Sequence, residues 1–209
     1  MYEEIVFEEK YSKSLQDLRS IVGKKDKYTL GHLDRVSELS VLIGKKMGLA
    51  DSELQALKIG GLCHDIGKLE VDDSILFKET CLSDEEYSII KRHPVTGSEM
   101  LEEKGILKNI IPIIKYHHER YDGKGYPENL AGEQIPLLAR ITSVADAFDA
   151  MSSKRSYNNI MNMEDIKKEL ENNKGTQFDP IATDAFLDIL ENDIVKVREI
   201  QRTYMWQYE

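Results

Sequence analysis

Residues 136–152 read PLLARITSVADAFDAMS, which is the most apolar helical pattern in the chain. Apolar residues cover every face of a helix drawn through it, and a helix that is apolar all round is buried in a core. Two carboxylates interrupt the pattern: Asp146 and Asp149 lie three residues apart, on one face of that helix. A buried carboxylate without a partner costs several kcal/mol or takes up a proton. We therefore expect a cation to meet these aspartates.

The segments on both sides of this stretch also repeat apolar residues at helical spacing. Asp51 or Ser52 is expected to cap one of these helices, and Ser83 with Glu86 forms a capping-box pattern before another. Two glycines and a proline predict a loop over residues 121–127. No segment alternates with a period of two. The expected helices cover residues 11–22, 29–47, 51–63, 83–90, 95–104, 109–119, 136–152 and 162–175, and one more begins at Asp179-Pro180.

These patterns predict an all-α fold, a bundle of about seven to nine helices. We expect a lead-in helix over residues 1–25, one domain over residues 26–190 and a helical extension over residues 191–209.

Composition narrows the class of protein. The formal net charge of −10 argues against binding to a nucleic-acid polymer, which requires a basic face. No apolar run approaches the length of a membrane span, and the acidic N-terminus lacks the apolar core of a signal peptide. Cys63 and Cys81 are the only cysteines, as expected for reduced thiols in a cytosolic protein. The sequence therefore predicts a cytoplasmic protein without a membrane partner.

All five histidines lie inside or at the ends of expected helices, flanked by apolar residues: His32, His64, His93, His117 and His118. Imidazole and carboxylate groups are typical ligands of first-row metals. Adjacent residues such as His117 and His118 point about 100° apart on a helix, so one pair can reach two metal positions or wrap one metal.

Each of these residues alone has a plainer interpretation. A lone buried histidine is usually a hydrogen-bonded core residue, and the aspartates could pair with Arg140 or Arg155. Five such coincidences in one chain favour a metal site.

The pair in Cys63-His64-Asp65-Ile66-Gly67-Lys68 resembles the motif of the HD phosphohydrolase superfamily. Residues 117–127, HHERYDGKGYP, look like the extended motif of the HD-GYP family. Further segments follow in that family's order: GHLDRV (31–36), HPVTG (93–97), DAFDA (146–150), RSY (155–157) and QFDP (177–180). The resemblance spans roughly residues 26–190 and implies an HD-domain-type helical bundle with an HD-GYP catalytic domain.

The resemblance also implies a ligand set. One metal is held by His32, His64, Asp65 and Asp146, and a second by Asp65, His93, His117 and His118, with the Asp65 carboxylate bridging. Tyr28 stands where family members with a third metal have glutamate, so two divalent ions are expected. Iron and manganese come first among the first-row metals that suit such ligands.

Other positions correspond to residues that act on the substrate. Lys68 matches the family's lysine near the scissile phosphate, whereas its plainer reading is a solvated charge at a helix end. Tyr126 and Arg155 match positions implicated in substrate binding or loop structure. Asp149 is expected either to contact substrate or to orient a metal ligand or Arg155. Two departures, Ser156 for proline and Asn158 for a basic residue, lie in the expected ligand-binding segment.

The family's usual substrate is cyclic di-GMP. The resemblance therefore implies a phosphodiesterase in which a water activated by two metals opens cyclic di-GMP to linear pGpG, which some members cleave on to GMP. Asp65 and Lys68 are the expected catalytic residues. Two alternatives stay open: a hydrolase for another cyclic dinucleotide or phosphoester, and a non-catalytic module that binds nucleotide.

Partners are expected from two surfaces. The loop over residues 123–127 has a plain structural interpretation, in which its glycines free the backbone and Tyr126 packs. The resemblance implies instead that it forms a lip of the substrate pocket or contacts a protein such as a diguanylate cyclase domain or another regulator. Trp206 and Tyr208 either dock on the core or lie at a homodimer surface.

Overall fold

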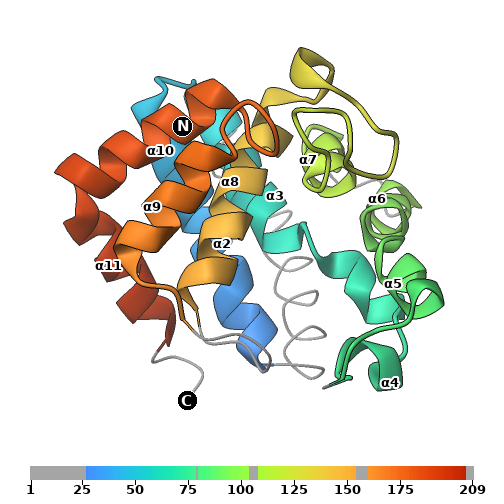
Figure 1. Cartoon of the computed structure of the whole chain (residues 1–209). Coiled ribbons are helices and arrows are strands. Elements are labelled where there is room, and N and C mark those ends of the chain that lie inside the picture. Colours follow the sequence, from blue (N-terminus) through green and yellow to red (C-terminus); the bar gives the residue numbers. More distant parts are fainter. Residues whose placement is uncertain (1–26, 79, 104–107, 154–159, 206–209) are drawn as a thin grey trace.

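The computed structural model describes residues 27–78, 80–103, 108–153 and 160–205 (Figure 1). These residues form helices and loops with no strand, and two isolated β-bridges join Asp122 to Ala131 and Lys174 to Phe178. The all-α prediction is confirmed. The elements are, in chain order, α2 (Lys27–Lys46), α3 (Asp51–Cys63), η1 (Ile66–Glu70), α4 (Asp73–Leu76), α5 (Asp84–Ile90), α6 (His93–Glu103), α7 (Ile111–Tyr116), η2 (Gly132–Gln134), α8 (Leu137–Ser152), α9 (Met163–Asn172), α10 (Pro180–Asn192) and α11 (Ile194–Met205).

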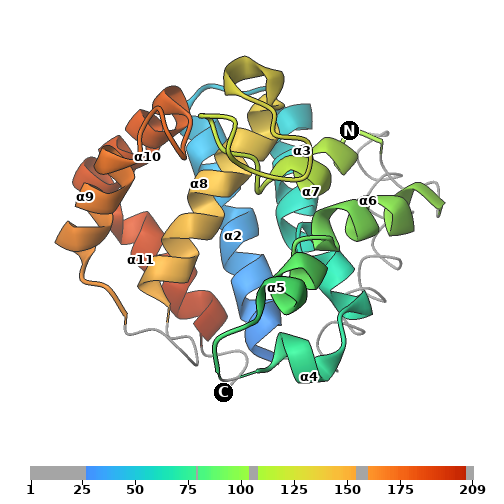
Figure 2. The same ribbon diagram turned by 45° about the vertical axis from the view of Figure 1, so that its right-hand side comes forward.

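The apolar stretch at residues 137–152 forms α8, which packs against α2 at the centre of the molecule (Figure 2). Phe148 of α8 is fully buried and meets Phe186 of α10 edge to face, with ring centroids 4.9 Å apart. Helices α9, α10 and α11 cover one side of this pair, while α3 and the segments from α4 to α7 lie on the other. A second, smaller apolar cluster joins α3, α6 and α7 through Ile59, Leu101 and Ile113. The histidines and aspartates expected to bind metal lie where these two apolar clusters meet.

Several helix starts match the sequence patterns. The Ser83 hydroxyl accepts a hydrogen bond from the Glu86 amide, and the Glu86 carboxylate accepts one from the Ser83 amide, so the predicted capping box is confirmed. Asn162 and Asp179 cap α9 and α10 with their side chains.

Other boundaries differ from the predictions. Ala50, rather than Asp51 or Ser52, is the residue before α3, because the Glu53 carboxylate accepts a hydrogen bond from the Ala50 amide. The helix expected over residues 109–119 is shorter: α7 ends at Tyr116, and the Glu119 amide closes a tighter turn on the Tyr116 carbonyl. Elements η1, α4 and η2 were not predicted, because segments of three to five residues are too short to carry a helical period.

A proline fixes the start of α6. The preceding helix ends at Ile90, and α6 begins at His93, which puts Pro94 in the first turn, where its missing N–H is not needed.

The predicted lead-in helix over residues 11–22 lies outside the described residues. Within the described ranges, none of the helices combines the length and the apolarity that a bilayer crossing requires.

The contact between η1 and α6 leaves no room for a side chain at Gly67. A Cβ atom there would overlap the His93 carbonyl oxygen and lie 2.6 Å from the Gly97 amide nitrogen. Because the obstacle is backbone, it cannot rotate away. Gly67 therefore allows the segment that carries His64 and Asp65 to lie against the start of α6.

We expect Gly67→Ala to lower the free energy of unfolding by about 1–3 kcal/mol or more, the usual cost of overpacking a close contact. Urea unfolding of the metal-free protein measures this. Gly48→Asn is the control, since Gly48 has a φ of +76°, which asparagine tolerates, and open space where a Cβ would lie. An alanine at position 67 without effect would contradict the close packing of η1 on α6.

Candidate metal centre

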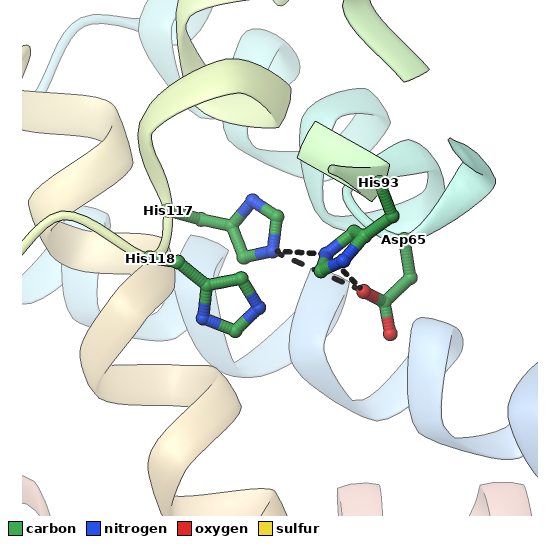
Figure 3. A group of neighbouring side chains, drawn as sticks. All are labelled: Asp65, His93, His117 and His118. Atoms are coloured by element: carbon green, nitrogen blue, oxygen red, sulfur yellow. Dashed lines mark hydrogen bonds and ion pairs between the residues drawn. The ribbon is translucent and has the colours of Figure 1, made fainter. Parts of the chain in front are cut away.

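Seven side chains from five segments of the chain converge between the two apolar clusters. His32 comes from α2, Asp146 from α8, and His64 and Asp65 from the junction of α3 and η1. His93 is the first residue of α6, and His117 and His118 follow α7 (Figure 3). They fall into two groups that could each hold an ion, and Asp65 belongs to both: Asp65, His93, His117 and His118 form one group, and His32, His64 and Asp65 form the other.

The Asp65 carboxylate divides its two oxygens between these groups. Oδ1 lies 3.1 Å from His93 Nε2 and 3.9 Å from His117 Nε2. Oδ2 lies 3.6 Å from His64 Nε2 and 3.8 Å from His32 Nε2. A carboxylate in this position has the geometry of a bridge between two neighbouring cation sites.

Asp146 adds a second carboxylate to the group around His32. Its Oδ1 lies 3.4 Å from His32 Nε2 and 4.0 Å from His64 Nε2. Asp146 belongs to the buried helix α8. This carboxylate, which interrupts the apolar pattern of that helix, therefore faces the cluster.

Four of the imidazoles are oriented by a hydrogen bond on the far side of the ring. Nδ1 of three of them lies 2.7–2.8 Å from a backbone carbonyl three residues earlier in the chain: His64 on Gly61, His93 on Ile90 and His117 on Ile114. His32 Nδ1 lies 2.8 Å from the Asp149 carboxylate. Because a carbonyl or carboxylate oxygen accepts, each Nδ1 carries the proton. Each Nε2 then presents its lone pair to the centre, as metal-binding histidines do.

The residues fit a metal ion. Within the described residues, the buried atoms His64 Nε2 and Asp65 Oδ1 have no hydrogen-bond partner. A buried polar atom without a partner costs about 1–3 kcal/mol, so such atoms call for an explanation. A cation in each of the two groups would satisfy them, one at His64 Nε2 and the other at Asp65 Oδ1. Nitrogen and oxygen donors of this kind suit first-row transition metals.

Electrostatics favour the protonation states that ligands need. Burial lowers the pKa of His64 and lowers the pKa of His117 to about 3, so both rings are neutral at pH 7. Burial and the neighbouring His117 also hold the pKa of His118 well below its usual range. Burial alone would raise the pKa of Asp65, but the Lys68 ammonium and His64 outweigh it and lower that pKa well below its ordinary value.

Asp149 is not placed to touch a substrate. Its side chain is fully buried; it holds His32 and receives hydrogen bonds from Arg35 Nε at 2.6 Å and Arg35 Nη2 at 3.0 Å. This position favours the alternative that Asp149 orients a ligand over the expectation that it binds substrate.

The other predicted substrate residues lie at the edge of the centre. Lys68 is partly buried, with Nζ 2.5 Å from Asp65 Oδ2. The Tyr126 ring stacks on His118 with centroids 4.9 Å apart. The predictions that involve Arg155, Ser156, Asn158, Trp206, Tyr208 and the Tyr28 side chain lie outside the described residues.

Sequence reasoning missed two residues of this site. Arg35 is 5% exposed and neutralises Asp149, and Glu119 is 3% exposed and contacts the loop after His118. A signal for Arg35 existed: it lies three residues after His32, on an otherwise apolar helix face.

The fold and the site together define a class, all-helical proteins with a buried centre of histidines and aspartates. The family model described as HD domain matches residues 16–181. The chain belongs to this family.

Comparisons with individual proteins agree. The chain is 37% identical over 182 residues to the cyclic di-GMP phosphodiesterase response regulator RpfG of Xanthomonas campestris, covering 86% of this chain and 48% of that protein. It is 36% identical over 174 residues to the 3'3'-cGAMP-specific phosphodiesterase 2 of Vibrio cholerae, covering 82% of this chain and 33% of that one. This chain thus spans half or less of the length of these relatives.

Among solved structures, the chain is similar to Bd1817, an HDG"Y"P protein from Bdellovibrio bacteriovorus. The TM-score is 0.65 at 26% identity, and the match covers 80% of this chain and 54% of that one.

The contact between Asp149 and His32 yields a test. We expect Asp149→Asn to weaken Mn²⁺ or Co²⁺ binding about 10- to 100-fold, because His32 loses its charged acceptor and the Arg35 charge loses its counter-ion. Competition with a chromophoric chelator measures the change.

Asp179→Asn is the matched control. Asp179 is also buried and pairs with Arg140, but it caps α10, a role that asparagine keeps. Equal loss of affinity in both variants would mean that Asp149 acts through general stability rather than through His32.

Proposed function

We propose that this chain is a metal-dependent phosphodiesterase of the HD-GYP type that opens cyclic di-GMP to linear pGpG. The observation that carries the proposal is the Asp65 carboxylate, with one oxygen toward each of two imidazole groups. Paired cation sites a few ångströms apart are typical of enzymes that cleave phosphodiesters.

The substrate class rests on two further supports. RpfG is named a cyclic di-GMP phosphodiesterase, and the Vibrio cholerae relative is named for 3'3'-cGAMP, so both act on cyclic dinucleotides. Residues 117–127, HHERYDGKGYP, carry the loop sequence for which the HD-GYP family is named. We favour cyclic di-GMP as substrate and treat 3'3'-cGAMP as the alternative within the same chemistry.

His32, His64, Asp65 and Asp146 would hold one ion, and Asp65, His93, His117 and His118 the other. We propose iron or manganese, since neutral imidazoles with two carboxylates suit both. When bound, the ions would supply Lewis acidity and lower the pKa of water toward neutrality.

The protein's own residues supply positioning and charge. The four hydrogen-bonded imidazoles are aimed before any ligand arrives, which lowers the cost of ordering the site. The Lys68 ammonium lies next to the bridging carboxylate, where it can offset negative charge on a phosphate that approaches Asp65. Burial excludes water around the cluster and strengthens these interactions.

Turnover of cyclic di-GMP by protein purified without oxygen, with its metal content measured, tests the proposal. We expect the wild type to form pGpG and Asp65→Asn to be slower by at least about 100-fold, because the bridge between the groups is weakened. Asp179→Asn is the matched control. Faster cleavage of 3'3'-cGAMP would move the substrate assignment. Tight binding of cyclic di-GMP without turnover, in metal-loaded wild type, would support a non-catalytic module instead.

Lys68 should matter to the reaction. We expect Lys68→Met to lower kcat by about 10²–10³-fold, the usual cost of losing a charge that stabilises the transition state. Steady-state kinetics with metal content measured in parallel separate the two effects.

Lys58→Met is the control, since Lys58 is an exposed lysine near Glu38. An unchanged kcat in Lys68→Met with full metal content would assign Lys68 to the protein surface rather than to the reaction.

A further inference from the structure

His118 is oriented differently from the other histidines of the centre. The rings of His32, His64, His93 and His117 each have Nδ1 on an oxygen acceptor. In the described part of the chain, the His118 ring is contacted by other rings instead: those of His93, His117 and Tyr126. Its aim must therefore come from packing.

We propose that Tyr126 and Glu119 are positioning residues for His118, in which Glu119 fixes the loop after His118 and the loop's tyrosine ring holds the imidazole in place. The inference concerns the metal centre and does not depend on which substrate is cleaved.

The contact between Tyr126 and His118 is direct. The two rings stack with centroids 4.9 Å apart and planes inclined by 27°. The Tyr126 amide also donates a hydrogen bond to the His118 carbonyl, at 3.3 Å. The same residue thus fixes both the backbone and the ring of His118. The centroid of the half-buried His118 ring also lies 4.1 Å from that of His117 and 5.0 Å from that of His93, so three neighbouring rings contact it.

Glu119 fixes the loop from inside. Its carboxylate accepts a hydrogen bond from the Glu128 amide at 2.6 Å and another from the Leu130 amide at 3.1 Å. These two amides lie just after Tyr126 in the chain, and a buried carboxylate on backbone donors is a strong, charge-assisted contact. Glu119 is adjacent to His118, so the loop is tied to the residue next to the one that it orients.

The rest of the loop leaves little slack. Gly125 packs so closely on Glu119 that a Cβ atom there would lie 2.5 Å from the Glu119 Cα atom. Asn129 donates a side-chain hydrogen bond to the Gly125 carbonyl. At the start of the loop, the Tyr121 amide donates to the Gln177 carbonyl at 3.1 Å. The loop backbone is therefore fixed both before and after Tyr126 in the chain.

The two residues should act on metal binding through His118 alone. His118 belongs to the group with Asp65, His93 and His117 that could hold one ion, and it is not a member of the group of His32, His64 and Asp65. If His118 loses its orientation, metal binding by the group of Asp65, His93, His117 and His118 should weaken, and metal binding by the group around His32 should be unchanged. If the loop has a purely structural role, the substitutions should instead lower the stability of the protein and leave the absorption spectrum of the bound ion unchanged.

Binding of Co²⁺ to the full chain tests the proposal, by chelator competition and by the visible absorption of the bound ion. We expect Tyr126→Leu to weaken binding to one site about 10- to 100-fold and to change the absorption, because a group that orients a metal ligand is lost. Tyr126→Phe keeps the stacked ring and should match the wild type. Tyr116→Leu is the matched control, since Tyr116 contacts the same loop through Glu128 but lies outside the cluster.

Glu119→Gln tests the other half of the proposal. The amide keeps the volume but offers a single oxygen, so one loop N–H meets an NH₂ group and loses its acceptor. We expect the same loss at the same site. Glu128→Gln, in an exposed glutamate of the same loop that pairs with Lys115, should leave Co²⁺ binding unchanged. Thermal unfolding in chelator shows which variants remain folded.

The outcomes separate this proposal from the proposed function. Wild-type binding of Co²⁺ by Tyr126→Leu overturns the positioning role, even if turnover falls. Equal losses in Tyr126→Phe and Tyr126→Leu would assign the effect to the hydroxyl and overturn it as well. A wild type that binds two ions and cleaves no cyclic dinucleotide refutes the proposed function and leaves the positioning role standing.

Discussion

The structure depends on one buried anion. Asp65 is buried, and among the described residues the Lys68 ammonium of η1 is the cation that lies against its carboxylate, while imidazoles from α2, α6 and the end of α7 face it with the lone pairs that a metal ion would accept. A buried charge without partners costs several kcal/mol, a large share of the roughly 5–15 kcal/mol by which a domain is stable. The segments that surround Asp65 must therefore keep their places.

Much of the fold follows from local sequence. The apolar stretch at 136–152 had to be buried, and the caps at Ser83, Asn162 and Asp179 start the helices that they predict. The predicted cap of α3 was wrong, because the capping group is the carboxylate of Glu53, inside the helix, rather than a side chain at its end. The early end of α7 could not be predicted either, since the Glu119 carboxylate accepts hydrogen bonds from amides nine and eleven residues further along the chain.

The selection of site residues drew on a different signal, polar groups inside apolar patterns. The structure brings all seven selected imidazoles and carboxylates together, and that they bind metal stays a prediction. Asp149 was selected correctly as a buried exception, but its partner Arg35 decides what it does. Spacing identifies which residues turn inward and cannot say which of them face one another, because that depends on how distant helices pack.

The candidate ligands are spread along most of the chain, from His32 on α2 to Asp146 on α8. An ion that binds only when these segments are assembled adds its binding free energy to the folded state, about 4 kcal/mol at a free concentration a thousand times the dissociation constant. Supply of the metal would then govern how long each copy of the protein survives proteolysis as well as whether it is competent. Starvation for the ion would thin the population of the protein itself.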